Sequence, residues 1–273
     1  MTTCPITFVG GGNMARSLIA GLIRQGAAPG HIHVAEPVAD LRSQLTAEFG
    51  VKTYASATEA AAQGTVWVLA VKPQVLRDVC AALADMAQAQ APLVVSIAAG
   101  ITSAQLVRWL GGDAAVVRAM PNTPALLGAG VTGLFATAGV SADQRGQADT
   151  VLRSAGRTVW IDDETRMDAV TAVSGSGPAY VFLLAEAMEA AGIAQGLPAA
   201  AARTLVVQTL LGASRMLDES GEAPAELRRR VTSPNGTTQA AIESFQADGF
   251  EAIVDRAIDA ATRRGRALSS AND

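Results

Sequence analysis

The stretch ITFVGGGNMARSLIAGL, residues 6–22, decides how the rest of the chain is organised. An apolar run ends in three glycines, and apolar residues with helical spacing follow, which predicts a strand, a tight turn and a helix. Gly10, Gly12 and Ala15 fall on the G-x-G-x-x-G/A pattern. Gly10 permits the turn, Gly12 lets a pyrophosphate approach the backbone, and Ala15 keeps the helix close to the strand. The helix that follows the turn presents unpaired N–H groups to the phosphates. The pattern therefore predicts a dinucleotide site rather than a plain glycine-rich turn.

The composition of the 273 residues is that of a globular protein. Apolar residues make up 49% and charged residues 17%, which is not the balance of a disordered chain. The net charge of −4 gives no reason to expect nucleic acid or an anionic membrane as partner. We recognise no signal peptide and no run of about 18 apolar residues, so we expect a cytoplasmic protein without a membrane span.

The cysteines and histidines form no recognisable metal or nucleophile pattern. Cys4 and Cys80 are too few for a disulfide framework and fit a reducing cytoplasm. His31 and His33 could place two ligands on one strand, but two neighbouring ligands alone rarely hold a metal. We therefore predict no metal site and no Cys–His pair.

Strand and helix patterns alternate after the first helix, and the strand in residues 31–37 ends in Glu36. An acidic residue at this distance from the glycines can accept hydrogen bonds from the adenosine ribose hydroxyls. It would also repel a 2′-phosphate, so on this residue alone NADH is favoured over NADPH. Arg42, the nearest arginine, lies in the next helix. A surface carboxylate without a ligand is the alternative.

Two further strands end in residues suited to a cofactor. In GTVWVLAVKPQ, residues 64–74, the near-continuous apolar run predicts a parallel strand buried on both faces, and Lys72 follows it. Lys72 could be close to the cofactor or as incidental as Lys52. PLVVSIAAG, residues 92–100, ends in small residues that leave room for a ring above the sheet. Ligands bind at the carboxyl edge of such sheets, so the C-terminal ends of both strands are candidate parts of the cofactor site.

The strand at 114–120 leads into Pro121–Pro124, where Asn122 and Thr123 either offer polar side chains at this edge or belong to a rigid turn. Strand patterns at 131–137 and 157–162, with a helix at 141–154 between them, would add strands at one side of the sheet. We expect residues 1–162 to form an α/β dinucleotide-binding domain.

From about Glu164 onward the spacing is helical. Ser174–Tyr180 should open a long helix to about Ala191, with serines as caps and Pro178 in the first turn. A second long helix at 198–218 is apolar on much of its circumference, so it must be buried. This predicts an obligate homodimer through these helices, with burial inside the monomer as the alternative. We expect residues 163–273 to form an all-α domain.

Near the C-terminus, PAELRRRVTSPNGTT, residues 224–238, ends in a turn rich in hydroxyls and glycine before a helix from about Gln239. A turn of this kind at a helix N-terminus is a receptor for an anion such as a carboxylate. A plain capped turn is the alternative.

Taken together, the motifs resemble those of pyrroline-5-carboxylate reductase, the last enzyme of proline biosynthesis. The likeness runs nearly end to end and rests on FVGGGNMA, LAVKPQ, VSIAAG, MPNTP, AVSGSGPAY and PAELRRRVTSPNGTTQAAIESF. The resemblance implies a Rossmann domain and a helical dimerisation domain with interleaved helices, whose dimers often assemble into a larger ring. It also implies reduction of (S)-1-pyrroline-5-carboxylate to L-proline by hydride transfer from NADPH or NADH.

The resemblance also implies roles for the residues that match the family's motifs. The phosphate turn comprises Val9, Gly10, Gly11, Gly12, Asn13 and Met14. The strand end that lines the cofactor comprises Ala70, Val71, Lys72 and Pro73. The residues by the nicotinamide are Ala98, Ala99 and Gly100. The substrate loop comprises Ser233, Asn235, Gly236, Thr237 and Thr238.

In the family, backbone amides of this loop hold the substrate carboxylate, and the residue matching Thr238 sits by the ring nitrogen. Two positions depart from the pattern. Arg230 stands where some relatives have asparagine, so we assign it no contact. Glu36 stands where relatives that favour NADPH tend to have a small polar residue, so the preference between the two cofactors stays open.

The implied reaction needs little from side chains. A protonated cyclic imine is already a good hydride acceptor, and orientation over the nicotinamide supplies much of the rate. Reduction of another small cyclic imine is an alternative. A β-hydroxyacid-type dehydrogenase would need a lysine after a glycine-rich helix start, and the chain has no lysine beyond Lys72. An alternative that is not an enzyme is a scaffold that binds a dinucleotide as a signal and recruits partners.

Overall fold

The computed structural model describes residues 4–271, which form two compact units. The first unit extends to Ser176 and resumes at Ala260, and the second comprises Gly177–Asp259. The division therefore falls later than the boundary expected at residue 162. The reason is packing, because Met167 and Ala172 are fully buried within the first unit.

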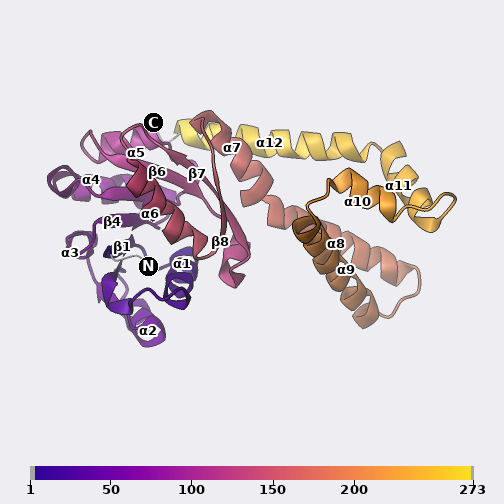
Figure 1. The fold of residues 1–273 in the computed structure, drawn as a ribbon, viewed down its shortest axis with the longest axis horizontal. Coiled ribbons are helices and arrows are strands. Elements are labelled where there is room, and N and C mark those ends of the chain that lie inside the picture. The colour runs from indigo at the N-terminus through magenta and orange to yellow at the C-terminus, as the bar shows by residue number, and fades with distance from the viewer. Residues whose placement is uncertain (1–3, 272–273) are drawn as a thin grey trace. The chain divides into compact units, whose positions relative to one another are not determined.

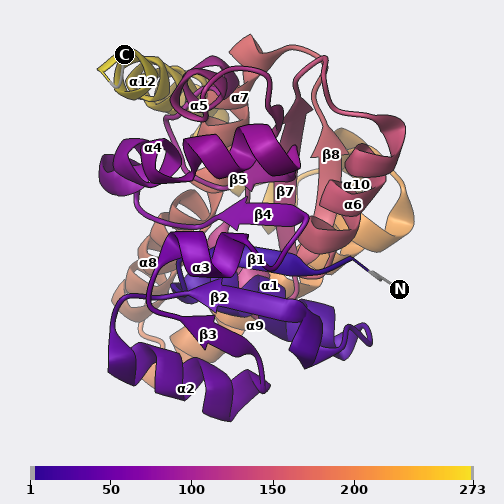
Figure 2. The same cartoon turned by 90° about the vertical axis from the view of Figure 1, so that its left-hand side faces the viewer.

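The first unit is built on a sheet whose strands, among the described residues, lie in the order β3-β2-β1-β4-β5-β6-β7-β8 (Figures 1 and 2). Strands β1 to β6 run parallel, β7 is antiparallel to β6, and β8 is parallel to β7. This confirms the α/β class and the strands added at one side. The strands are β1 (Ile6–Val9), β2 (Ile32–Ala35), β3 (Lys52–Tyr54), β4 (Val66–Leu69), β5 (Leu93–Ser96), β6 (Ala115–Met120), β7 (Gly130–Ala136) and β8 (Gly156–Trp160).

Helices cover both faces of this sheet, so its central strands are buried on both sides. Phe8 and Val68 pack into one apolar cluster, and Trp67 and Leu69 pack into the other. This alternation explains the continuous apolar pattern of β4. The α-helices that end within the first unit are α1 (Asn13–Arg24), α2 (Ala39–Phe49), α3 (Ala57–Ala61), α4 (Pro73–Gln90), α5 (Ser103–Trp109), α6 (Ala142–Arg153) and α7 (Met167–Val170). Short 3₁₀ segments are Pro29–His31, Thr123–Leu127 and Glu164–Arg166, and Thr171–Gly175 is a π-helical turn.

A buried arginine joins several of these elements. Arg118 on β6 is 5% exposed, and its guanidinium lies 3.1 Å from Glu164 Oε1 and 3.6 Å from Asp168 Oδ1. Glu164 in turn accepts from the backbone N–H of Ser103 at 2.7 Å, at the start of α5. A charge removed from water needs such partners, so this network fixes α5 and α7 to β6.

The second unit is helical, as expected. Its helices are α8 (Gly177–Ala194), α9 (Ala199–Ser220), α10 (Pro224–Arg230), α11 (Thr237–Ala247) and α12 (Phe250–Ala271), and α12 ends within the first unit. None of the residues of α8 is buried in the single chain, and Phe182 and Leu183 are 67% and 66% exposed. The alternative of burial inside the monomer concerns α9, in which Ala202 and Val206 are buried but Leu205, Val207 and Leu211 are each more than half exposed. Burial inside the monomer therefore covers only part of the apolar surface of α9. Within the described residues, no helix is both long and apolar enough to span a membrane.

Candidate functional site

The glycine turn after β1 has the conformation that a dinucleotide site requires. Gly10 has a φ of +106°, and a Cβ there would lie only 2.7 Å from the carbonyl oxygen of Ala70. A Cβ on Gly12 would meet no atom within 4 Å. Gly12 is also the N-cap of α1 and gives that helix no side-chain cap, so the space beside it and the first amides of α1 suit a pyrophosphate.

Glu36 lies beside this turn, directly after β2. Its side chain accepts from the backbone N–H of Gly11 at 3.4 Å and of Val38 at 3.0 Å, and the residue is only 8% exposed. The Arg42 guanidinium donates to the carbonyl oxygens of Glu36 and Pro37 at 2.8 and 2.9 Å. The structure thus brings the carboxylate to the phosphate turn and fixes it there.

The other expected cofactor residues follow the neighbouring strands. Ala70 comes directly after β4 and donates its N–H to Val9 O at 2.8 Å, while Lys72 is the N-cap of α4. Ala98–Gly100 lie in the segment after β5, which ends at Ser96, earlier than the expected strand. Because these strands are parallel neighbours, their ends form one row along the carboxyl edge. In strand order, the row comprises Glu36 after β2, Val9–Met14 after β1, Ala70–Pro73 after β4 and Ala98–Gly100 after β5.

The segment after β6 has a role that the sequence analysis did not foresee. Asn122 is 9% exposed, and its side-chain amide donates to Ser174 O at 3.1 Å and accepts from Val131 N at 3.0 Å. It therefore joins the start of β7 to the π-helical turn.

The expectation that serines cap α8 is wrong. Ser174 lies inside the π-helical turn and donates its hydroxyl to Val170 O at 2.9 Å, and Ser176 N donates to Thr171 O at 2.8 Å. The helical path thus continues from α7 into α8 instead of starting at a cap. Pro178 was a signal for this irregularity, because it lacks the N–H that Ser174 O would accept in an α-helix.

The loop expected to bind the substrate lies in the second unit. Gly236 N donates to Ser233 O at 3.0 Å, and Asn235 has a φ of +60°, which closes a tight turn. The N-cap of α11 is Gly236, again without a side-chain cap, and Thr238 lies in the first helical turn. The loop therefore has the shape of an anion receptor. Arg230 forms an ion pair with Glu222, and the hydrogen bond that its guanidinium donates to this carboxylate raises the pKa of Arg230.

The cysteines and histidines offer no alternative centre. Burial raises the pKa of the Cys80 thiol to about 12, so it is not a nucleophile near neutral pH. Burial, together with Lys52 and His31, lowers the pKa of His33, whose Nδ1 lies 2.9 Å from the Tyr54 hydroxyl. Across residues 4–271, no group of three or more possible metal ligands is found.

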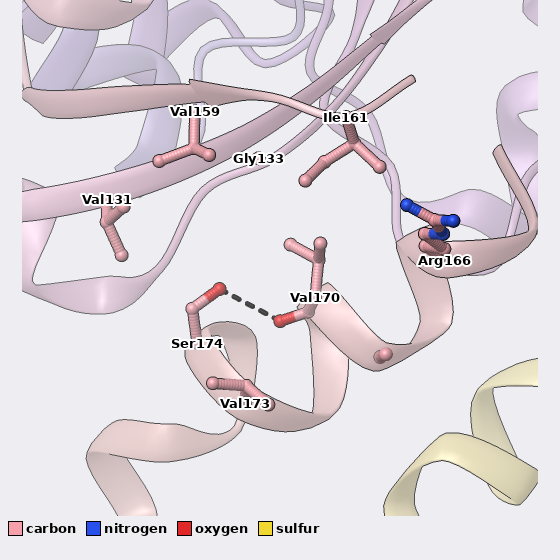
Figure 3. Close-up of a pocket in the computed structure, with 9 residues that line it drawn as sticks. Val131, Gly133, Val159, Ile161, Arg166, Val170, Val173 and Ser174 are labelled. Carbon is pink, nitrogen blue, oxygen red and sulfur yellow. Dashed lines mark hydrogen bonds between the residues drawn. The ribbon is translucent and has the colours of Figure 1, made fainter. Parts of the chain in front are cut away.

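An apolar pocket lies on the β7–β8 side of the first unit (Figure 3). It has a volume of about 350 Å³, and four of its nine lining residues are valines: Val131, Val159, Val170 and Val173. Ser174 points into this region, but its hydroxyl is donated to Val170 O. Arg166 and Ser174 are the only residues of its lining with polar side chains. The row of strand ends presents backbone amides and a fixed carboxylate, so this row remains the candidate site for a dinucleotide.

Comparisons with known proteins cover almost the whole chain. A family described as pyrroline-5-carboxylate reductase dimerisation matches residues 164–268, and one described as NADP oxidoreductase, coenzyme F420-dependent, matches residues 5–100. The pyrroline-5-carboxylate reductases of Pseudomonas aeruginosa and Haemophilus influenzae are 53% and 42% identical to the chain. The alignments cover 98% of both chains for the first and 97% of both for the second.

Solved structures show the same likeness. A pyrroline-5-carboxylate reductase from Coxiella burnetii matches with a TM-score of 0.95 and 40% identity, over 98% of this chain and 99% of the other. A pyrroline carboxylate reductase from Plasmodium falciparum, solved with NADP bound, matches with a TM-score of 0.86 and 27% identity. That alignment covers 98% of this chain and 99% of the other.

Two glycine variants test the cofactor turn. Gly10→Ala should destabilise the fold by more than about 1 kcal/mol, because the methyl group meets the Ala70 backbone in a strained conformation. Gly12→Ala should cost about 1 kcal/mol or less, the loss of a favourable N-cap residue, but weaken NADH and NADPH binding at least about tenfold. Denaturant unfolding and fluorescence titration measure the two effects. Undiminished cofactor affinity in Gly12→Ala would contradict the assignment.

Proposed function

The chain belongs to the pyrroline-5-carboxylate reductase family, and from this premise we propose which of its residues bind the cofactor and the substrate. The identity of 53% over 98% of the chain carries the family assignment. The enzyme is an NAD(P)H-dependent oxidoreductase that reduces 1-pyrroline-5-carboxylate to proline. The test is the initial rate of NADH and NADPH oxidation with this imine, with proline identified as the product. Absence of turnover with both cofactors would contradict the assignment.

We propose that the row of strand ends holds NAD(P)H, which supplies the hydride. The support is the fit of this edge to such a ligand. The backbone beside Gly12 is open, the first turn of α1 is uncapped, and a fixed carboxylate stands next to the turn. Val9–Met14 would hold the pyrophosphate and Glu36 the adenosine ribose. Ala70–Pro73 and Ala98–Gly100 would line the nicotinamide half.

The substrate loop is assigned to Ser233–Thr238. Its support is the uncapped N-terminus of α11, whose backbone amides and partial positive charge suit a carboxylate. Thr238 lies in the first turn of this helix, so its hydroxyl is available to the ring nitrogen of a substrate held there. A threonine hydroxyl is too weak an acid to protonate an imine alone. Its role is to fix which face of the ring meets the hydride.

The homodimer expected from the sequence remains a proposal, with α8 and α9 as the interface. The support is the exposure of Phe182 and Leu183 on α8 and of Leu205 and Leu211 on α9, together with the dimerisation family that matches this region. Exposed apolar side chains that gather on one surface mark an interaction site. We extend the proposal to a ring of dimers and to a cytoplasmic location. Light scattering measures the mass of the particle in solution. A mass equal to that of one chain would contradict the proposed dimer.

Thr238→Ala should lower kcat/KM for the imine at least about tenfold, near 1.4 kcal/mol, because the hydroxyl that orients the ring is lost. Thr238→Ser keeps a hydroxyl at the same position and is the matched control, which should lose much less. Steady-state kinetics at saturating cofactor measures both. Equal kinetics of the wild type and Thr238→Ala would remove this residue from the mechanism.

Glu36→Ser should raise the ratio of NADPH affinity to NADH affinity at least about tenfold. The substitution removes the buried carboxylate that accepts from the ribose diol and repels a 2′-phosphate. Direct titration with both cofactors measures the ratio. Glu48→Ser is a control, because Glu48 pairs with Arg16 at a half-exposed position on α2. An unchanged ratio in Glu36→Ser would show that Glu36 does not contact the ribose.

A further inference from the structure

The order of the strands determines where the imine must lie. Glu36 stands after β2 and the phosphate turn after β1, so the cofactor would extend from there across β4 toward β5. The nicotinamide and the imine above it then border the end of β6, the next strand in the sheet. Met120 is the last residue of β6, and Asn122 follows it after Pro121.

The π-helical turn Thr171–Gly175 packs against this end of β6. A Cβ on Gly175 would lie 2.5 Å from the terminal methyl group of Met120, so there is no space between them. Turns of this kind interrupt the regular ladder of helical hydrogen bonds and often occur at functional sites. The turn is therefore part of the border around the place assigned to the imine.

One carbonyl group of this turn cannot be satisfied in the ordinary way. In an α-helix, Ser174 O would accept from the N–H four residues later, but that residue is Pro178, which has none. Asn122 supplies the missing donor at 3.1 Å. The side-chain oxygen of Asn122 accepts from Val131 N, so the amide is held at both ends.

We propose that Asn122 is a positioning residue for imine reduction, which acts by holding the π-helical turn through the Ser174 carbonyl group. The proposal rests on the proposed function and adds a residue that does not itself touch the cofactor. Without the hydrogen bond from Asn122 to Ser174 O, the π-helical turn becomes more mobile, and the side of the imine site that it forms is less well defined. Because the turn lies at the end of β6, the phosphate turn and Glu36 are not disturbed.

The test uses Asn122→Ala and the second substitution Pro178→Ala in the full-length enzyme. Asn122→Ala should lower kcat/KM for 1-pyrroline-5-carboxylate at least about tenfold while leaving the Kd of NADH within about twofold. Pro178→Ala returns an N–H to the helix, which can donate to Ser174 O in place of Asn122. It should therefore raise kcat/KM at least about threefold in the Asn122→Ala background and give no gain in the wild type.

Asn122→Asp provides a second variant, because it keeps the acceptor for Val131 N but replaces the donor with a carboxylate oxygen, which repels Ser174 O. Its kinetic loss should be at least as large. Hydrogen exchange of the backbone amides in residues 171–179 should be faster in both Asn122 variants. This readout is independent of turnover, so it separates failure of this proposal from failure of the proposed function. Unchanged kcat/KM, an equal loss of NADH affinity, or no gain from Pro178→Ala would overturn the role of Asn122.

Discussion

The first unit depends on how closely the backbone after β1 approaches the end of β4. Gly10 takes a left-handed conformation there, and even a single methyl group would meet the Ala70 carbonyl group at 2.7 Å. This contact places the start of α1 directly at the carboxyl edge of the sheet. The same edge holds Glu36 on one side and Ala98–Gly100 on the other, so one close approach sets the line along which we propose that the dinucleotide lies.

The chemistry assigned to this edge makes modest demands on side chains. The thiol of Cys80 is buried with a pKa of about 12, and burial lowers the pKa of His33 on β2. Hydride transfer to a cyclic imine depends mainly on holding two rings in the right orientation. A rigid backbone border matters more for such a reaction than a strong acid or base. The anchoring of the π-helical turn by Asn122 is consistent with that requirement.

Much of the fold could be predicted from the sequence, because its signals are local. Three features follow from hydrophobic periodicity or from residue types within a single element. They are the glycine turn, the continuous apolar run of β4 and the long apolar helices. The position of the division between the two units was not predictable in this way. It depends on contacts between distant segments, such as Gly265 of α12 against Asp168 of α7.

The positions of the candidate site residues were predictable to a similar extent. Spacing alone placed Gly12 and Glu36 at strand ends on the carboxyl edge, where the structure has them, and their roles in cofactor binding stay predictions. Asn122 was noted only as a polar residue in a turn, because its role depends on a carbonyl group that is 52 positions away. The serines before α8 were misinterpreted as caps, because serine and glycine before a proline are also typical of a helix start. Pro178 fits both a first helical turn and a carbonyl group left without its usual donor, so it did not distinguish the two.

Hydride transfer from the cofactor to the imine carbon is the step on which the proposed function depends. The most direct measurement is reduction of 1-pyrroline-5-carboxylate with NADH that carries two deuterium atoms at C4 of the nicotinamide, followed by mass spectrometry of the proline. The proline should carry one deuterium, at the δ carbon. Proline without the label, or no proline at all, would contradict this step.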